Sequence, residues 1–297
     1  MRSTPALAFL ALLTAFARAA PDIRPQFQVI NGHGQSISIY WLNPDGSKVL
    51  SGTVAPGQSQ LIATTIGHEF LITNGRSGQD RKVTAELPVR AYRYPSAPTA
   101  LPHHNQIILP PPGLALPAFY TQCISAHGFP IVASASVSPF ALKESAWLAD
   151  QMLAHRPDVR TAMIKSGARM CIIAHNEFTT DLPEFSHLKC PSGYEPLSGK
   201  KYWDARARGT GGSQTDPHCT CAEENVLAYP GDPYQRECIL IHEFAHNIHL
   251  RGLVNVDPTF DRRLKQAYDE AMARNLWAGK YPSVNHHEYF AEGVQSW

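Results

Sequence analysis

The chain has 297 residues, which is enough for one large domain or two of ordinary size. Its 26 Lys and Arg residues nearly balance its 25 Asp and Glu residues, and no long run of one sign occurs. This balance argues against nucleic acid or an anionic membrane surface as the main partner. The apolar content of 43% is ordinary for a globular protein and allows a sizeable core.

The N-terminus has the pattern of a secretory signal peptide. Arg2 precedes a short apolar run from Ala6 to Phe16, and Ala17-Arg18-Ala19 fits a small-x-small cleavage site. We therefore expect residues 1–19 to be removed and the protein to be secreted to the extracellular space. The alternative is an uncleaved anchor or a buried helix, which the shortness of the apolar run disfavours.

Six cysteines follow this segment: Cys123, Cys171, Cys190, Cys219, Cys221 and Cys238. An even number in an exported chain favours disulfide bonds, although the sequence does not choose among the pairings. Cys219 and Cys221 are too close to pair easily with each other, so we expect each to have a distant partner. An alternative is a structural zinc held by the last four cysteines, which lack the usual paired Cys-x-x-Cys spacing.

Residues 23–95 have the pattern of short strands joined by turns. Ile37, Ile39 and Trp41 alternate with polar residues, as in a half-buried strand, and we expect all three side chains in the core. Further strands are expected at residues 27–30, 61–65 and 69–72, with turns at Asn43-Pro44-Asp45-Gly46 and Ala55-Pro56-Gly57. Turns at this spacing predict a small β-sandwich.

The same segment resembles the β domain of the von Hippel–Lindau tumour suppressor. The shared motifs are Tyr40-Trp41-Leu42-Asn43, Asp45-Gly46, Pro56-Gly57 and Gly67-His68. In that family the sandwich binds a peptide that contains hydroxyproline. The resemblance places His68 at the pocket histidine, Thr64 at the pocket serine and Phe70 at the pocket tryptophan. The pocket tyrosine falls near Ser51, which is not aromatic.

The rest of the chain predicts a linker and a second domain. Residues 96–118 are rich in proline and indicate a stiff linker. Residues 119–297 mix helical and strand patterns. Helices are expected at residues 139–154, 238–250, 258–279 and from 285 onward, with strands at 169–174 and 225–229. The expected fold class is therefore α+β, with a small sandwich joined to a larger domain.

The strongest chemical signal is His242-Glu243-Phe244-Ala245-His246. Residues four apart on a helix share a face, so both imidazoles can reach one metal ion. Glu243 would border a metal-bound water and can act as its general base. Between residues 238 and 250 it is the only Asp, Glu, Lys or Arg, as a buried metal-bearing helix needs. The alternative is a helix with two surface histidines.

A catalytic zinc needs a third protein ligand. The third histidine of the metzincins is absent, and His249 is expected to lie too far along the helix. Residues 281–292 resemble the zinc peptidase domain of anthrax lethal factor, through a tyrosine, an asparagine and a Glu-aromatic-Phe-Ala-Glu motif. By this resemblance Glu288 is the third zinc ligand, and the Tyr281 phenol stabilises the oxyanion. The resemblance implies a zincin-like fold for this domain.

Helical spacing supports a division of roles between two carboxylates. Glu288 and Glu292 lie one turn apart, so both can face the metal helix. One can bind the ion, and the other can accept a hydrogen bond from a ligating histidine. We assign Glu288 to the first role and Glu292 to the second. His286 and His287 are rival ligands that rank below Glu288, and Asn285 is expected to cap the helix.

These patterns predict a secreted zinc-dependent metalloendopeptidase with Zn²⁺ as cofactor and a protein or peptide as substrate. Residues 221–229 are expected to form an edge strand that aligns the substrate. One alternative is an extracellular peptide-binding protein with an inactive zinc domain, against which the intact Glu243 argues. Another is a zinc hydrolase of non-peptide amides. No Gly-x-Ser-x-Gly motif occurs, which argues against a serine hydrolase.

Overall fold

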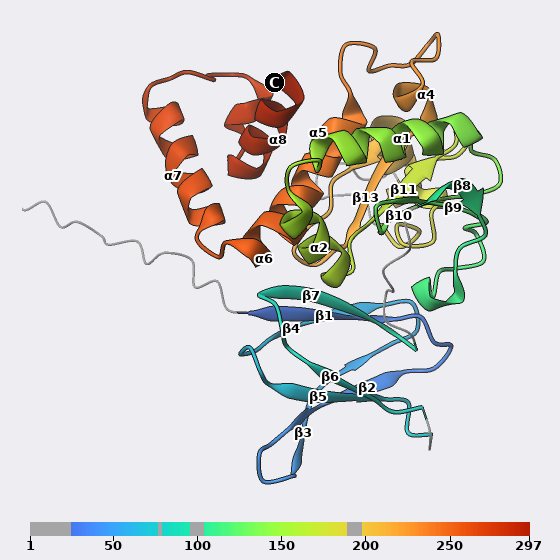
Figure 1. Ribbon diagram of the computed structural model, residues 1–297, viewed down its shortest axis with the longest axis vertical. Helices are drawn as coiled ribbons and strands as arrows, with labels where there is room; N and C mark the ends of the chain where they lie inside the picture. Colours follow the sequence, from blue (N-terminus) through green and yellow to red (C-terminus); the bar gives the residue numbers. More distant parts are fainter. Residues whose placement is uncertain (1–24, 77–78, 96–103, 189–197) are drawn as a thin grey trace, which may run out of the picture.

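The computed structural model describes residues 25–76, 79–95, 104–188 and 198–297 (Figure 1). Helices and strands both contribute substantially, so the chain is α+β as expected. The expected signal peptide, residues 1–19, lies outside the described residues, and so does Cys190. Within the described part, no helix combines the length and the apolar character needed to cross a membrane.

Residues 26–94 form two sheets around one core, which we call the N-terminal sheet pair. One sheet has the strand order β4-β1-β7, and the other has the order β3-β2-β5-β6. The strands are β1 (Gln26–Asn31), β2 (Ile37–Leu42), β3 (Lys48–Val54), β4 (Ser59–Ala63), β5 (Glu69–Thr73), β6 (Arg81–Thr84) and β7 (Val89–Tyr94). Ile37 and Ile39 are buried as their alternation predicts, whereas Trp41 is only partly buried at the margin of the core.

A six-stranded sheet with the order β12-β13-β11-β10-β9-β8 lies at the centre of the second part. The strands are β8 (His104–Ile108), β9 (Gln122–Ala126), β10 (Phe129–Ala133), β11 (Arg169–Ile173), β12 (Gly209–Thr210) and β13 (His218–Ala222). The three central strands β10, β11 and β13 are parallel and fully buried. Burial on both faces explains why the residues of β11 from Met170 to Ile173 are apolar without alternation, while Arg169 at its start is a buried charged residue.

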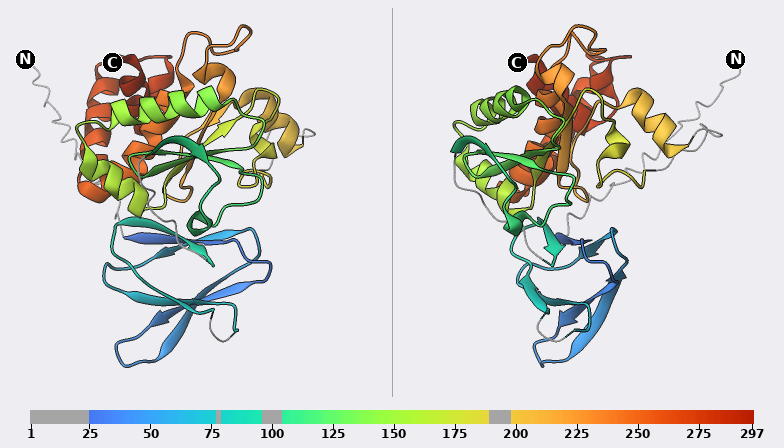
Figure 2. Two further views of the ribbon diagram at one scale, coloured as in Figure 1. Left: turned by 45° about the vertical axis from the view of Figure 1, so that its right-hand side comes forward. Right: turned by 90° about the vertical axis from the view of Figure 1, so that its right-hand side faces the viewer.

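Helices and loops cover the two faces of this sheet (Figure 2). The helices are α1 (Pro139–Met152), α2 (Pro157–Lys165), α3 (Gly199–Arg206), α4 (Glu223–Val226), α5 (Ile239–Asn247), α6 (Val254–Val256), α7 (Phe260–Ala273) and α8 (His286–Ser296). A π-helix, η3 (Ile248–Leu253), continues α5, and short 3₁₀ turns lie at η1 (Pro112–Leu114), η2 (Thr179–Asp181) and η4 (Tyr281–Ser283). One face packs on α1, α2 and α5, and the other on η1 and the segment after η2.

Four predicted elements differ from the structure. The predicted linker, residues 96–118, contains strand β8, which lies at a sheet edge where neighbouring prolines are tolerated. The predicted strand at 225–229 is wrong, because Asn225 lies in α4. The Asn225 side-chain NH₂ group donates to Asp232, and the side-chain oxygen Oδ1 accepts from the Ile239 N–H. These hydrogen bonds stabilise a local loop, so the segment does not pair as a strand.

The predicted edge strand at residues 221–229 is also wrong. Its first two residues belong to β13, which lies between β11 and β12 and has no free edge. The edge strand on that side is β12, which lies in the glycine-rich segment 206–213, where the composition predicts a loop. In addition, α7 ends at Ala273, before the expected stop at Gly279.

The expected disulfide bonds are absent among the described residues. Cys123, Cys171, Cys219, Cys221 and Cys238 are all free thiols. Cys219 and Cys221 point into the core beneath α5, while Cys123 and Cys171 point into the core on the opposite face of the sheet. They are core residues that pack as small hydrophobic side chains, and burial raises the pKa of the Cys123 thiol to about 12.

Direct hydrogen bonds fix the N-terminal sheet pair onto the second part. The Asn255 side chain accepts from the Val89 N–H at 2.9 Å and donates to the Val89 carbonyl at 3.0 Å. The Arg251 guanidinium in η3 donates to the Gln28 side chain of β1 at 3.1 Å. These contacts join β1 and β7 to the helical segment that follows α5, so the two parts have a defined relative position.

The core beneath α5 gives a stability prediction. Phe129 is fully buried, and its ring centroid lies 5.3 Å from that of Phe244 on α5. We expect Phe129→Ala to lower the free energy of unfolding by about 3–5 kcal/mol, because it leaves a cavity under the helix. Phe140→Ala, at a site that is 69% exposed, should change it by less than about 0.5 kcal/mol. Urea unfolding of both variants tests this, and equal effects would contradict it.

Candidate metal centre

Helix α5 presents two imidazoles on one side and packs on the core with the other. Leu240, Phe244 and Ala245 are buried against the sheet, and this packing holds the helix in place. His242 and His246 face away from that core but are only 6% and 7% exposed, because α8 covers them. The expected pairing of the two histidines on one helical face is thus present.

The carboxylate of Glu288 on α8 completes a triangle with these two imidazoles. Its Oε2 atom lies 3.1 Å from His242 Nε2 and 3.2 Å from His246 Nε2, and the two Nε2 atoms lie 3.2 Å apart. Ligand atoms on a tetrahedral zinc, each about 2.0–2.1 Å from the ion, are roughly 3.3 Å from one another. The three side chains therefore fit the ligand set of a zinc ion.

The start of α8 fixes the position of Glu288. The Asn285 side-chain oxygen accepts hydrogen bonds from the His287 N–H at 2.8 Å and the Glu288 N–H at 2.9 Å. This is the expected N-cap, and it anchors the turn that carries Glu288. Burial alone would raise the pKa of Glu288, but the hydrogen bonds from His242 and His246 lower it to about 2.

Two further residues of α8 contact the other nitrogen of His242. His242 Nδ1 lies 3.3 Å from Glu292 Oε1 and 3.1 Å from Gln295 Oε1. An Nδ1–H donated to these oxygens would leave Nε2 free to bind a metal. Sequence reasoning selected Glu292 for this contact and missed Gln295. The signal for Gln295 is its helical spacing, because it lies two turns after Glu288 on the same face of α8.

Glu243 lies beside the triangle without taking part in it. Its carboxylate is within 4.8 Å of nitrogen atoms of His242 and His246. It lines the same cavity and is partly exposed there. Burial raises the pKa of Glu243 to about 7, although the two histidines oppose this shift. A carboxylate with a raised proton affinity at this place is suited to accept a proton from water.

Tyr281 in η4 lies at the rim of the same cavity. Its ring centroid is 6.0 Å from that of His242, and the residue is 58% exposed. Burial of part of the ring, together with Glu288 and Glu243, raises the pKa of the Tyr281 phenol to about 12. The hydroxyl group is therefore protonated near neutral pH and available as a hydrogen-bond donor.

A cleft of about 1200 Å³ opens over the triangle, between β12 and the segment before α8. The backbone of β12 passes very close to α5. A Cβ atom on Gly209 would collide with the Ile239 side chain, and one on Gly211 would lie 2.6 Å from the His246 ring. These glycines allow an open strand edge to run alongside α5.

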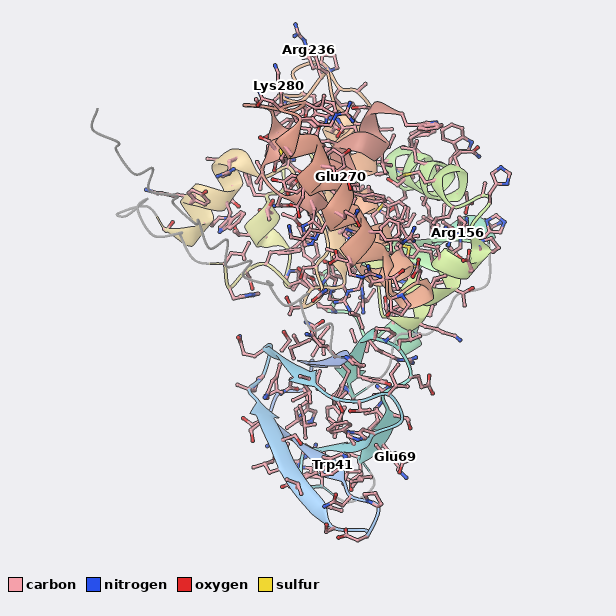
Figure 3. The ribbon with its side chains drawn as sticks, turned by 90° about the vertical axis from the view of Figure 1, so that its left-hand side faces the viewer. Trp41, Glu69, Arg156, Arg236, Glu270 and Lys280 are labelled. Atoms are coloured by element: carbon pink, nitrogen blue, oxygen red, sulfur yellow. The ribbon has the colours of Figure 1, made fainter. Side chains whose placement is uncertain are left out.

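The candidate residues of the N-terminal sheet pair also lie together. Thr64 Oγ1 is 3.1 Å from His68 Nδ1, and the Trp41 ring lies 5.3 Å from the His68 ring. A groove runs over these residues and Ser51. Phe70 also lines this groove, although it is only 3% exposed and packs on Phe27 in the core. Figure 3 shows Trp41 in the sheet pair and Glu270 on α7 in the second part.

No protein-family model matches this chain, and a search of curated proteins finds no match either.

The Asn285 cap gives a prediction about the stability of the start of α8, the turn that carries Glu288. Asn285→Ala should lower the free energy of unfolding by about 1 kcal/mol, because two N–H groups of α8 lose their acceptor. Asn285→Ser should restore most of this loss, since a serine oxygen can also cap. Thermal unfolding of the metal-free protein tests the comparison. Equal stability of the alanine variant and the parent would show that the cap contributes nothing.

Proposed function

We propose that the protein is a secreted zinc-dependent metalloendopeptidase, with a sandwich resembling the von Hippel–Lindau β domain followed by a zincin-like domain. The observation that carries the proposal is the convergence of His242 Nε2, His246 Nε2 and Glu288 Oε2, with edges of 3.1–3.2 Å, beside the carboxylate of Glu243. Two neutral imidazoles and one carboxylate are a ligand set of catalytic zinc sites. Secretion rests on the signal-peptide pattern of residues 1–19.

Each residue of the site has a separate role in the proposed hydrolysis. A zinc ion held there would lower the pKa of its bound water to about 7 and polarise a substrate carbonyl. Glu243 accepts the proton of the attacking water and can pass it to the leaving amine. The Tyr281 hydroxyl donates a hydrogen bond to the carbonyl oxygen as negative charge develops on it. Glu292 and Gln295 hold the His242 ring through its Nδ1 atom.

The substrate would be an extended peptide. The outer edge of β12 is unpaired within the described sheet and lines the cleft. An extended backbone can pair with such an edge, which directs its carbonyl groups toward the adjacent α5. The sequence predicts this role for residues 221–229, and we propose β12 for it instead, because β12 is the edge strand on that side.

A second candidate function is peptide recognition by the N-terminal sheet pair, with an inactive metal domain. The groove over Trp41, Thr64 and His68 favours this function. The two candidates differ in what they require of Glu243, because metal binding alone does not need that carboxylate.

The metal ligands and the base give separable predictions. The mature chain should contain about one zinc ion at this site, and Glu288→Ala should lose most of it. Glu243→Gln should retain the ion and lose at least about 100-fold in turnover. Elemental mass spectrometry and a fluorogenic peptide library provide the two measurements.

The matched control is Glu237→Gln, which makes the same change at another carboxylate lining the cleft. It should leave both zinc content and turnover nearly unchanged. Full turnover in Glu243→Gln would exclude the general-base role. A parent chain without zinc, together with peptide binding by the sheet pair, would favour the second candidate.

The Tyr281 hydroxyl should act mainly in the transition state. Tyr281→Phe is expected to lower kcat by roughly 10²–10³ with little change in KM, because the donor to the developing oxyanion is lost. Steady-state kinetics on the best library peptide measure both constants. The control is Tyr234→Phe, which removes the phenol that donates to the Arg206 carbonyl at the margin of the same cleft. A rise in KM alone would assign Tyr281 to substrate binding.

A further inference from the structure

Three helical segments bring a second group of metal-binding side chains together. His249 comes from η3, Asp261 from α7, and His286 and His287 from the start of α8. Asp261 Oδ1 lies 3.0 Å from His249 Nε2, 3.0 Å from His286 Nε2 and 3.8 Å from His287 Nε2. One ligand atom each from His249, Asp261 and His287 falls within 4.8 Å of the others. This group shares no residue with the triangle of His242, His246 and Glu288.

The burial of His249 sets it apart from an ordinary core histidine. The residue has no exposed surface, and its Nδ1 atom has no hydrogen-bond partner in the described part of the chain. A buried nitrogen without a hydrogen-bond partner is destabilising, so an interaction that satisfies it would be favoured. The other ring nitrogen, Nε2, lies 3.0 Å from Asp261 Oδ1, so the imidazole contacts the cluster through that atom.

The backbone at His249 is also unusual. Residues 248–253 form a π-helix, and such turns are rare and occur frequently at functional sites. The π-helix follows α5 directly and carries His249 toward α7 and α8. An irregular turn that delivers a buried imidazole to a carboxylate and a second imidazole agrees with a binding role.

We propose that His249, Asp261 and His287 form a second binding site for a divalent transition-metal ion. Two imidazoles and one carboxylate suit zinc and several of its neighbours in the first row. His286, which contacts the same Asp261 oxygen, would orient that carboxylate. The site does not depend on the proposed peptidase activity, because it needs only its own ligands.

The position of this site points to a structural role. His249 lies three residues after His246, and His287 directly precedes Glu288. An ion shared by η3, α7 and α8 would hold α8 against the helix that carries the first two histidines. Removing it should therefore weaken the first centre indirectly, while removing the first ion leaves the second ligand set intact.

Metal stoichiometry tests the proposal. The full chain is stripped with a chelator, reloaded with zinc, dialysed and measured by elemental mass spectrometry. The parent should hold about two ions, and His287→Ala and Asp261→Asn about one each. His246→Ala should also retain about one ion, at the second site. The control is His155→Ala at an exposed histidine, which should retain both.

The set of variants that lose a bound ion distinguishes the two sites. His287 is partly exposed, and Asp261→Asn keeps its shape, so circular dichroism should show both variants folded. If the parent and these two variants bind the same number of zinc ions per chain, the proposal is overturned. The cluster around Asp261 would then be only a hydrogen-bond network. One ion in the parent that survives His246→Ala and disappears in His287→Ala would support the second site while refuting the first.

Discussion

Glu288 follows His242 by 46 residues, and its carboxylate reaches the two imidazoles only because α8 packs across α5. Every contact between α8 and the two histidines depends on the position of α8 relative to α5. The Asn285 cap sets the first turn, Glu288 meets both Nε2 atoms, and Glu292 with Gln295 holds the far side of His242. A rotation of α8 by one residue would separate all of these groups. The core beneath α5, where Phe244 packs on Phe129, fixes the position of α5 itself.

The N-terminal sheet pair is fixed to the same framework through polar contacts. Arg251 is fully buried and donates to Gln28, and Asn255 bonds both backbone groups of Val89. Burial lowers the pKa of Arg251 to about 10, against the influence of Asp216, so the guanidinium still carries its charge near neutral pH. Buried polar contacts add little net stability, but they strongly penalise any other arrangement of the two parts. Because Arg251 lies in η3, this attachment also bears on the segment that carries His249.

The features that could be predicted from the sequence are those in which a residue spacing corresponds to a single local geometry. His242 and His246 at four-residue spacing, Glu288 and Glu292 one turn apart, and Asn285 before a helix all lie as local geometry requires. Sequence reasoning failed where tertiary context decided. Cys123, Cys171, Cys219 and Cys221 are core residues on the two faces of a buried sheet, and Asn225 bonds a loop instead of a strand.

Other features could not be predicted because no local pattern encodes them. Gln295 is recognised only after the direction of α8 is known, and Asp261 meets His249 only through the packing of α7. Similarly, β12 is two residues long and rich in glycine, so nothing in its composition indicates a strand. The close passage of this strand does impose a rule on the sequence. A Cβ on Gly209 would lie 2.4 Å from the Ile239 side chain, and one on Gly211 would lie 2.6 Å from the His246 side chain, so neither position has room for a larger residue. A related chain with another side chain at position 246 could therefore accept a larger residue at 211, whereas glycine at 209 would still be needed wherever Ile239 is kept.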